Sequence, residues 1–115
     1  MTAESRQPAR PVRLRLSRKR GFKLQKLSRD TNGREAVVVS RPSRWGNPFP
    51  VKANGRERAI ALYEAHLRKT YGKRLGKALQ PLHGKNLACW CAHDLPCHAD
   101  LLLRLANDPR TVGGA

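Results

Sequence analysis

Acidic side chains are scarce in this sequence: eight Asp and Glu stand against 24 Lys and Arg, which gives a formal net charge of +16. Self-repulsion of that size is easiest to understand if an acidic partner neutralises it, and nucleic acid is the commonest such partner. Residues 1–34 hold eleven basic and two acidic side chains, so we expect the nucleic-acid footprint in this N-terminal third. The candidate contacts are Arg13, Arg15, Arg18, Lys19 and Arg20.

The excess of basic residues also has plainer interpretations. Isolated charge runs usually face water, so a solvated basic surface is one alternative. An acidic protein is another potential partner, in which case the chain would be a non-catalytic adaptor. The sequence does not indicate an oligomeric state.

Long apolar runs are absent as well. No stretch approaches the roughly 18 apolar residues of a membrane span, and the basic N-terminus lacks the apolar segment of a secretory signal. We therefore expect a cytoplasmic chain without a membrane partner. Aromatic residues make up only 5% of the 115 residues, which favours one small domain packed mainly with Leu, Val and Ala.

The two ends of the chain show no apolar periodicity. Residues 1–11 are expected to form a flexible basic arm and residues 108–115 a frayed tail. Residues 12–107 are predicted to form a single α/β domain, because strand patterns alternate with helix patterns along them. Crossover helices join parallel neighbours, so we expect a short, mostly parallel sheet flanked by helices.

Individual elements follow from local patterns. Val12, Leu14 and Leu16 alternate with polar residues as in a half-buried strand, and the β-branched run 36–39 predicts a strand buried on both faces. We also predict a strand over 86–90 and helices over 22–32, 55–71, 75–80 and 97–107. In the helix over 55–71, Asn54 is the expected N-cap with Glu57 as its capping partner, and the residues of the core face are Ile60, Tyr63, Leu67 and Tyr71. Pro81 is expected to end the helix over 75–80.

Four candidate metal ligands with sulfur or imidazole groups lie within ten residues: Cys89, Cys91, Cys97 and His98. They span the end of a predicted strand, a loop and the start of a predicted helix, where the helix dipole lowers the pKa of a thiol such as Cys97. In a strand, Cys89 and Cys91 would share one face, with Trp90 opposite. Thiolate and imidazole ligands suit zinc, although these spacings differ from the usual C-x2–4-C knuckle.

Two other interpretations of the cluster stay open. An odd number of cysteines in a cytoplasmic chain fits thiol chemistry, with Cys97 or Cys91 as nucleophile and His98 or His93 as base. Free cysteine is also among the most buried residue types, so the cluster could simply pack as small hydrophobic side chains.

The loop over residues 41–54 contains three prolines, which predicts a stiff, shaped loop without regular structure. Its candidate ligand contacts are Arg41 and Arg44 for phosphate, Trp45 for stacking a base, Gly46 for close backbone approach and Asn47 for a polar edge. Alternatively, Trp45 and Phe49 anchor the loop to the core, a role that we expect more of Phe49 than of Trp45.

The segments RPSRWGNPFPV and GKNLACWCAHDLPCHADLLLRLAN together resemble the domain-of-unknown-function family numbered 4326, found in bacteria and their phages. The likeness covers about residues 12–107 and implies a compact α/β domain, but it implies no reaction. The signature positions that it indicates are Trp45, Gly46, Asn47, Pro48, Cys89, Cys91, Cys97 and His98.

The arrangement of Cys97 and His98 is also similar to the uncharacterised family numbered 488, in which Arg follows the Cys-His pair. Ala99 stands there in this chain, so the resemblance carries over no anion-binding arginine.

Two alternative functions are therefore considered for the cysteine cluster and the Arg/Trp loop. The first is a nucleic-acid or nucleotide-associated domain with a Cys/His metal or thiolate site beside the Arg/Trp loop. The second is a cysteine-dependent enzyme for a nucleotide-derived or phosphorylated substrate, with Cys97 or Cys91 as nucleophile, His98 as acid/base and Arg44 holding phosphate.

Overall fold

The sheet of this protein is small and wholly parallel. The structure is a computed structural model, and it describes residues 10–113. Three strands lie in the order β1-β3-β2, so β3 is central and pairs with both neighbours. The strands are β1 (Arg13–Arg15), β2 (Ala36–Val38) and β3 (Asn86–Cys89).

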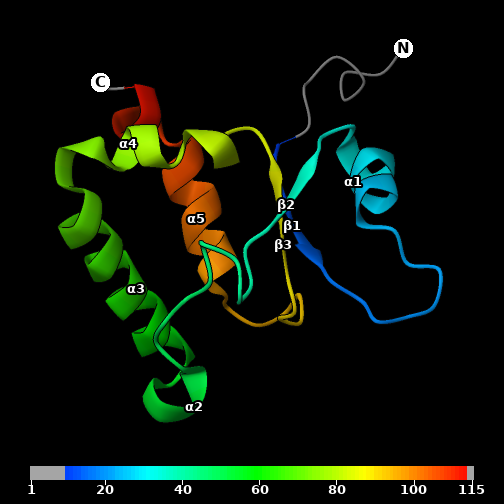
Figure 1. Cartoon of the computed structure of the whole chain (residues 1–115), viewed down its shortest axis with the longest axis horizontal. Helices are drawn as coiled ribbons and strands as arrows, with labels where there is room; N and C mark the ends of the chain where they lie inside the picture. Colours follow the sequence, from blue (N-terminus) through cyan, green and yellow to red (C-terminus); the bar gives the residue numbers. More distant parts are fainter. Residues whose placement is uncertain (1–9, 114–115) are drawn as a thin grey trace.

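Helices cover both faces of the sheet, which confirms the predicted small α/β fold. Figure 1 shows α1 on one side of the strands and α3, α4 and α5 on the other. The α-helices are α1 (Leu24–Asn32), α2 (Val51–Asn54), α3 (Arg56–Tyr71), α4 (Leu75–Ala78) and α5 (His98–Asn107). Short helical turns of other types cover Gly72–Arg74, Gln80–Leu82 and Pro109–Gly113.

The core has one cluster of buried side chains on each face of the sheet. The larger lies between the sheet and helices α3 and α5, and it includes Leu87 and Cys89 of β3. The smaller lies on the α1 side and consists of Leu14, Ala36 and Ala88. Because successive side chains of a strand point to opposite faces, Cys89 lies on the side of the sheet where α5 begins.

A buried asparagine fixes the start of the central strand. The side-chain oxygen of Asn86 accepts hydrogen bonds from the backbone N–H of Val12 and from the side-chain amide of Asn32, both at 2.9 Å. Its own amide donates to the hydroxyl of Ser28 at 2.7 Å. These bonds join β3 to β1 and α1 across long stretches of sequence.

The local patterns predicted most element boundaries. Helix α1 ends at Asn32, where Gly33 has a φ of 78°, a conformation that favours glycine. Helix α3 buries Tyr63 and Leu67 as expected, but Ala59 completes its buried face, whereas Ile60 is half-buried.

Several local expectations are wrong. Val38 is 39% exposed, because the edge strand β2 meets the smaller core cluster only at its Ala36 end. Residues Val51–Asn54 form a helical turn inside the predicted loop. Asn54 does not cap α3: the N-cap is Gly55, and the Asn54 amide donates to the Pro50 carbonyl instead.

The predicted tails lie only partly within the described residues. Of the predicted tail, Pro109–Gly113 form a helical turn that contacts α4 and α5. Most of the predicted arm, residues 1–9, and the last two residues lie outside the part of the chain that the structure describes. Within that part, none of the helices has the length and apolar character that crossing a membrane requires.

Candidate functional site

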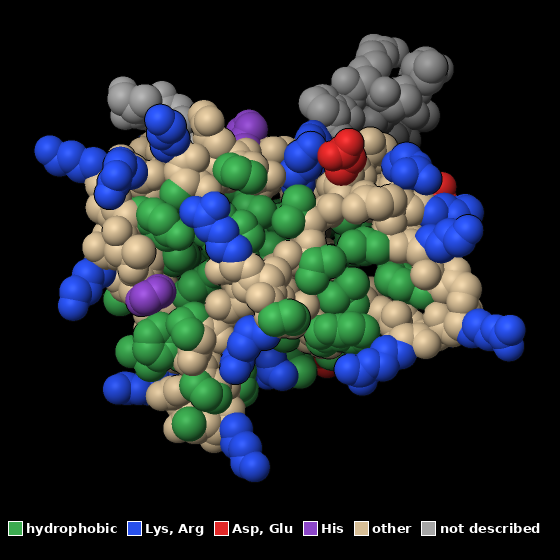
Figure 2. All heavy atoms as spheres, in the orientation of Figure 1, with side chains coloured by type: hydrophobic (Ala, Val, Ile, Leu, Met, Phe, Trp, Pro, Cys, Tyr) green, Lys and Arg blue, Asp and Glu red, His purple; other side chains and the backbone are tan. Residues whose placement is uncertain are grey.

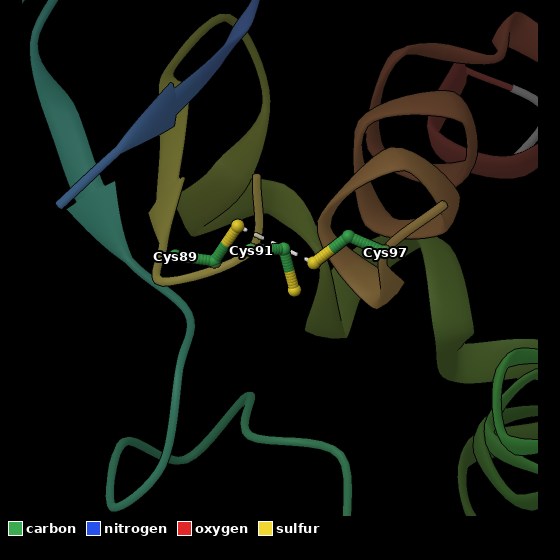
Figure 3. Close-up of side chains that lie close together, drawn as sticks. All are labelled: Cys89, Cys91 and Cys97. Atoms are coloured by element: carbon green, nitrogen blue, oxygen red, sulfur yellow. Dashed lines mark hydrogen bonds between the residues drawn. The ribbon is translucent and has the colours of Figure 1, made fainter. Parts of the chain in front are cut away.

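Three cysteine side chains meet where β3 passes over to α5. Cys89 ends β3, Cys91 lies in the loop that follows, and Cys97 directly precedes α5, and Figure 3 shows their side chains side by side. The three sulfur atoms lie within 4.8 Å of one another, and those of Cys89 and Cys97 are 3.3 Å apart. Cys89 and Cys97 are buried, whereas Cys91 is partly exposed.

Arg13 holds the loop between these cysteines in shape. Its guanidinium donates to the backbone carbonyls of Ala92, His93 and Leu95 and to the carboxylate of Asp100, at 2.7–2.9 Å. The Arg13 side chain is only 8% exposed. These bonds give Arg13, a predicted nucleic-acid contact, a structural role in the loop.

Asp100 completes this arrangement at the first turn of α5. Its carboxylate accepts a hydrogen bond from the backbone N–H of Cys97 at 3.1 Å, in addition to the bond from Arg13. A carboxylate in this place satisfies a backbone group that the helix leaves unpaired, and it fixes the backbone that carries the Cys97 sulfur.

His98 is oriented between a sulfur and a backbone carbonyl. Its Nδ1 lies 3.6 Å from Cys97 Sγ, and its Nε2 lies 2.7 Å from the carbonyl oxygen of Val39. A ring held this way donates its Nε2 proton to the carbonyl and leaves Nδ1 to face the sulfur. His98 thus contacts Cys97, but it is not part of the three-sulfur group.

The pKa values within the cluster are strongly perturbed. The hydrogen bond with Cys89 holds the pKa of Cys97 well below the ordinary thiol range, and the bonds with His98 and Cys91 act in the same direction against burial. The bond with Cys97, together with burial, raises the pKa of Cys89. The cluster therefore favours one thiolate, at Cys97, with the Cys89 sulfur remaining a thiol within hydrogen-bond distance of it.

The neighbours of Cys97 respond to that negative charge. Burial raises the pKa of Cys91, and the hydrogen bond with Cys97 adds to it, although Arg56 opposes the shift. Burial lowers the pKa of His98, but its hydrogen bonds with Cys97 and with the Val39 carbonyl outweigh that effect, so the net shift is upward.

A cavity of about 250 Å³ opens on the three cysteines and His98. Its other walls are Ser40, which follows β2, the loop over residues 41–50 and the starts of α2 and α3. Arg41 and Arg56 line it, and Arg56 lies 3.7 Å from Cys91 Sγ and donates to the Pro96 carbonyl at 3.2 Å. The cavity thus combines thiols with two cationic side chains.

The predicted loop contributes to this cavity less directly than expected. Trp45 is buried at 6% exposure and belongs to the core, whereas Phe49 is only partly buried, so the expected order of their anchoring roles is wrong. A buried indole offers no face for stacking a base. Arg44 lies over the Trp45 ring at 4.8 Å and is not among the cavity-lining residues, whereas Arg41 is.

Asn47 and Gly46 also have structural work in the loop. The Asn47 side chain donates to the Ala59 carbonyl and accepts from the N–H of Phe49, which ties the loop to α3. A Cβ at Gly46 would lie 2.9 Å from backbone atoms of Arg41, so glycine there allows the loop to fold on itself rather than a ligand to approach.

The remaining candidates for nucleic-acid contact are all exposed: Arg15, Arg18, Lys19 and Arg20. Basic side chains are not confined to the N-terminal third, however. Figure 2 shows Lys and Arg around the whole rim of the visible face, with few acidic side chains among them. On this face, basic side chains therefore lie well beyond the N-terminal third.

Comparison with known proteins gives a family without a function. The model of the family described as Domain of unknown function (DUF4326) matches residues 22–108. The chain belongs to this family. The match leaves β1 outside, although β1 is hydrogen-bonded to β3 and supplies Arg13 to the cysteine loop. No curated protein and no solved structure matches the chain.

Sequence reasoning missed two residues of the site. Arg56 stands at the start of a predicted helix among many other basic residues, so no local signal indicated its contact with Cys91. Arg13 was taken for a surface residue because it alternates with apolar residues in a strand. Only the packing of the 92–96 loop against β1 shows that its guanidinium is enclosed.

Proposed function

We propose that this protein is a nucleotide- or nucleic-acid-associated domain in which Cys89, Cys91 and Cys97 bind a zinc ion beside a phosphate-binding cavity. The convergence of the three sulfur atoms on one cavity is the observation that carries the proposal. The three cysteines also pack in the core cluster, but hydrophobic packing does not account for the Arg56 guanidinium 3.7 Å from Cys91 Sγ.

The donor set fits zinc. Zinc is bound by thiolates at about 2.3 Å, which places the sulfurs of a tetrahedral site about 3.8 Å apart. The three sulfur atoms, within 4.8 Å of one another, need only small movements to reach that arrangement. Three thiolates leave a coordination position for His98, as its Val39 contact would allow, or for a ligand in the cavity. Zinc there would act as a Lewis acid toward such a ligand.

The cavity favours a phosphate group rather than a whole nucleotide. Its volume of about 250 Å³ is below that of a typical site for a drug-sized ligand. Arg41 and Arg56 supply guanidinium groups, which bind phosphate in a bidentate way. We therefore propose that the phosphate enters between them while the remainder of the nucleotide or nucleic acid stays outside.

Metal analysis with matched variants tests this proposal. Elemental analysis of the purified protein should give about one zinc per chain, and the free-thiol count should rise after chelation. Cys91→Ser and Cys97→Ser should lower the zinc content severalfold. Ala88→Ser is the control, because it places a hydroxyl on the same strand but on the other face of the sheet. A metal-free wild-type protein with three reactive thiols would contradict the zinc site.

The contact between Cys97 and His98 favours a second candidate function, a cysteine-dependent enzyme. Proton transfer to Nδ1 would leave a Cys97 thiolate, which could attack an electrophilic centre of a phosphorylated or nucleotide-derived substrate while the imidazolium protonates the leaving group. In the metal-free protein, selective alkylation of Cys97 by iodoacetamide near neutral pH, lost in His98→Ala, would support this function over zinc binding.

A further inference from the structure

Trp90 is the exposed aromatic residue next to the cysteine cluster. It follows β3 directly, between Cys89 and Cys91, and it is 44% exposed, although both neighbouring cysteines line the cavity. Indole is the largest apolar side chain, and leaving it in water costs free energy. Its exposed part lies at the edge of the cysteine cavity, where a ligand can reach it.

Two arginines accompany this ring in a second hollow. The hollow measures about 420 Å³ and is lined by Trp90 and by the segment that leaves β1, including Arg15 and Arg18. The guanidinium carbon of Arg18 lies 4.8 Å from the centre of the Trp90 ring. Among the described residues, neither arginine forms an ion pair and no carboxylate lines the hollow.

We infer that Trp90, Arg15 and Arg18 form a stacking platform for single-stranded nucleic acid. An unpaired base offers its flat face to an indole, and Arg18, whose guanidinium lies over the Trp90 ring, would exchange that contact for a phosphate of the same strand, with Arg15 binding another. The bases of a duplex are stacked on one another and cannot reach a ring in a hollow, so the geometry selects single strands.

The platform adjoins the cysteine site. Trp90 lines both the cavity of the cysteines and the hollow of Arg15 and Arg18. A strand with one base on Trp90 therefore runs along the mouth of the cavity that holds Arg41 and Arg56. The inference rests on the proposed function in this respect, since it names single-stranded nucleic acid as the carrier of the phosphate.

Fluorescence anisotropy with labelled single-stranded dT15 tests the platform. We expect Trp90→Ala to weaken binding roughly tenfold, because stacking one base on an aromatic side chain commonly contributes that much. Trp90→Phe should keep most of the affinity, and Arg18→Ala should weaken binding severalfold. The matched control is Arg20→Ala, an exposed arginine that does not line the hollow. A duplex of the same length should bind more weakly than dT15.

Intrinsic fluorescence gives a measurement that needs no variant. Trp45 is buried, so iodide should quench mainly Trp90, and saturating dT15 should protect the ring from iodide. Equal binding of dT15 by wild type and Trp90→Ala, or unchanged quenching in the complex, would overturn the platform. Zinc content is measured separately: dT15 binding that depends on Trp90 in a zinc-free protein would refute the zinc site alone, whereas a zinc-loaded protein insensitive to Trp90→Ala would refute the platform alone.

Discussion

Gly46 shows how one residue can shape a site without contacting a ligand. A Cβ at this position would lie 2.5 Å from the Arg41 side chain and 2.9 Å from its Cα and backbone nitrogen. The close approach brings the loop back on itself and places Arg41 at the cavity. From the sequence, we expected the missing side chain of Gly46 to let a ligand approach the backbone. In the structure, it instead lets the backbone of Arg41 approach.

Gly46→Ala should therefore destabilise the fold by about 1–3 kcal/mol, the usual cost of overpacking a well-packed place. Thermal or urea unfolding would measure this. Arg41→Ala removes the 2.5 Å contact with the side chain but keeps both 2.9 Å backbone contacts. Gly46→Ala should therefore still lower the free energy of unfolding when it is made in the Arg41→Ala protein. If it lowered the free energy only in the wild type, the clash would involve the Arg41 side chain alone.

The cysteine cluster makes a prediction about pH at the same scale. Hydrogen bonds with Cys89, His98 and Cys91 lower the pKa of Cys97, so the reduced, metal-free protein should keep thiolate absorbance near 240 nm well below the ordinary thiol pKa of about 8.5. Cys97→Ser should abolish this absorbance at neutral pH, whereas Ala88→Ser should retain it.

The lowered pKa also fixes the sign of a stability effect. In the pH range between the folded and the ordinary pKa of Cys97, the folded state holds a thiolate and the unfolded state a thiol. The contribution of the Cys97 thiolate to the free energy of unfolding is therefore complete above the ordinary thiol pKa, and it is lost as the pH falls toward the pKa of Cys97 in the folded protein. Denaturant titrations of metal-free wild type and Cys97→Ser should show a difference that grows with pH between about 5 and 8.

Among the elements, β1 is the one whose role exceeds its length. It has only three residues, Arg13–Arg15, but it pairs with β3, and its Arg13 side chain donates hydrogen bonds to the loop that carries the cysteines. Arg13 and Arg15 share one face of this strand, but only Arg13 meets that loop. The two arginines have nearly the same sequence neighbours, but the Arg13 side chain is enclosed by the loop, whereas Arg15 is exposed.

Arg13→Gln should destabilise the protein by about 2–4 kcal/mol, because loop carbonyls at Ala92 and His93 lose their donors. It should also lower zinc content, since the cysteine loop loses its support. Arg15→Gln is the matched control and should change stability by less than about 0.5 kcal/mol, as expected for an exposed substitution. Equal effects of the two variants in urea unfolding would contradict the structural role of Arg13.

At the scale of the whole molecule, the formal net charge is +16, and basic side chains lie around the whole rim of the face that Figure 2 shows. Another hollow, of about 770 Å³, lies around α4 and is lined by Lys73, Arg74 and Lys77, among others. Binding of nucleic acid should therefore depend steeply on salt, because each phosphate that is neutralised releases counterions.

The two basic segments can be compared directly. Replacing Arg18, Lys19 and Arg20 by Ala should lower the salt slope for dT15 binding by about 0.7 for each phosphate contact that is lost on a single strand, and Arg18 is the one of the three that lines the hollow of Trp90. The same replacement at Lys73, Arg74 and Lys77 removes an equal charge and should change the slope less. A larger change from the second triple would place the footprint at the hollow around α4.

How far the sequence could predict the site depends on the range of the interactions. The cysteines were recognised because three of them lie within nine residues at the boundary of a strand and a helix. The expected strand alternation does not explain why Cys91 lies beside Cys89, because β3 ends at Cys89 and Cys91 belongs to the loop that follows. Trp45 and Phe49 were ranked wrongly, since both are aromatic and loop-borne, and only the packing against Tyr63, whose hydroxyl donates to the Trp45 carbonyl, distinguishes them.

The sequence by itself determined the alternation of strands and helices, the ends of the helices and the placement of the cysteines at one junction, because these depend on side-chain periodicity and backbone preference within a few residues. Tertiary structure decided which charged groups face the sulfur atoms. Arg13 and Arg56 reach the cysteine loop from 79 and 35 residues away, and His98 takes its orientation from Val39, 59 residues distant. Such contacts arise from the strand order and the packing of α3 against the sheet layer, which no local pattern specifies.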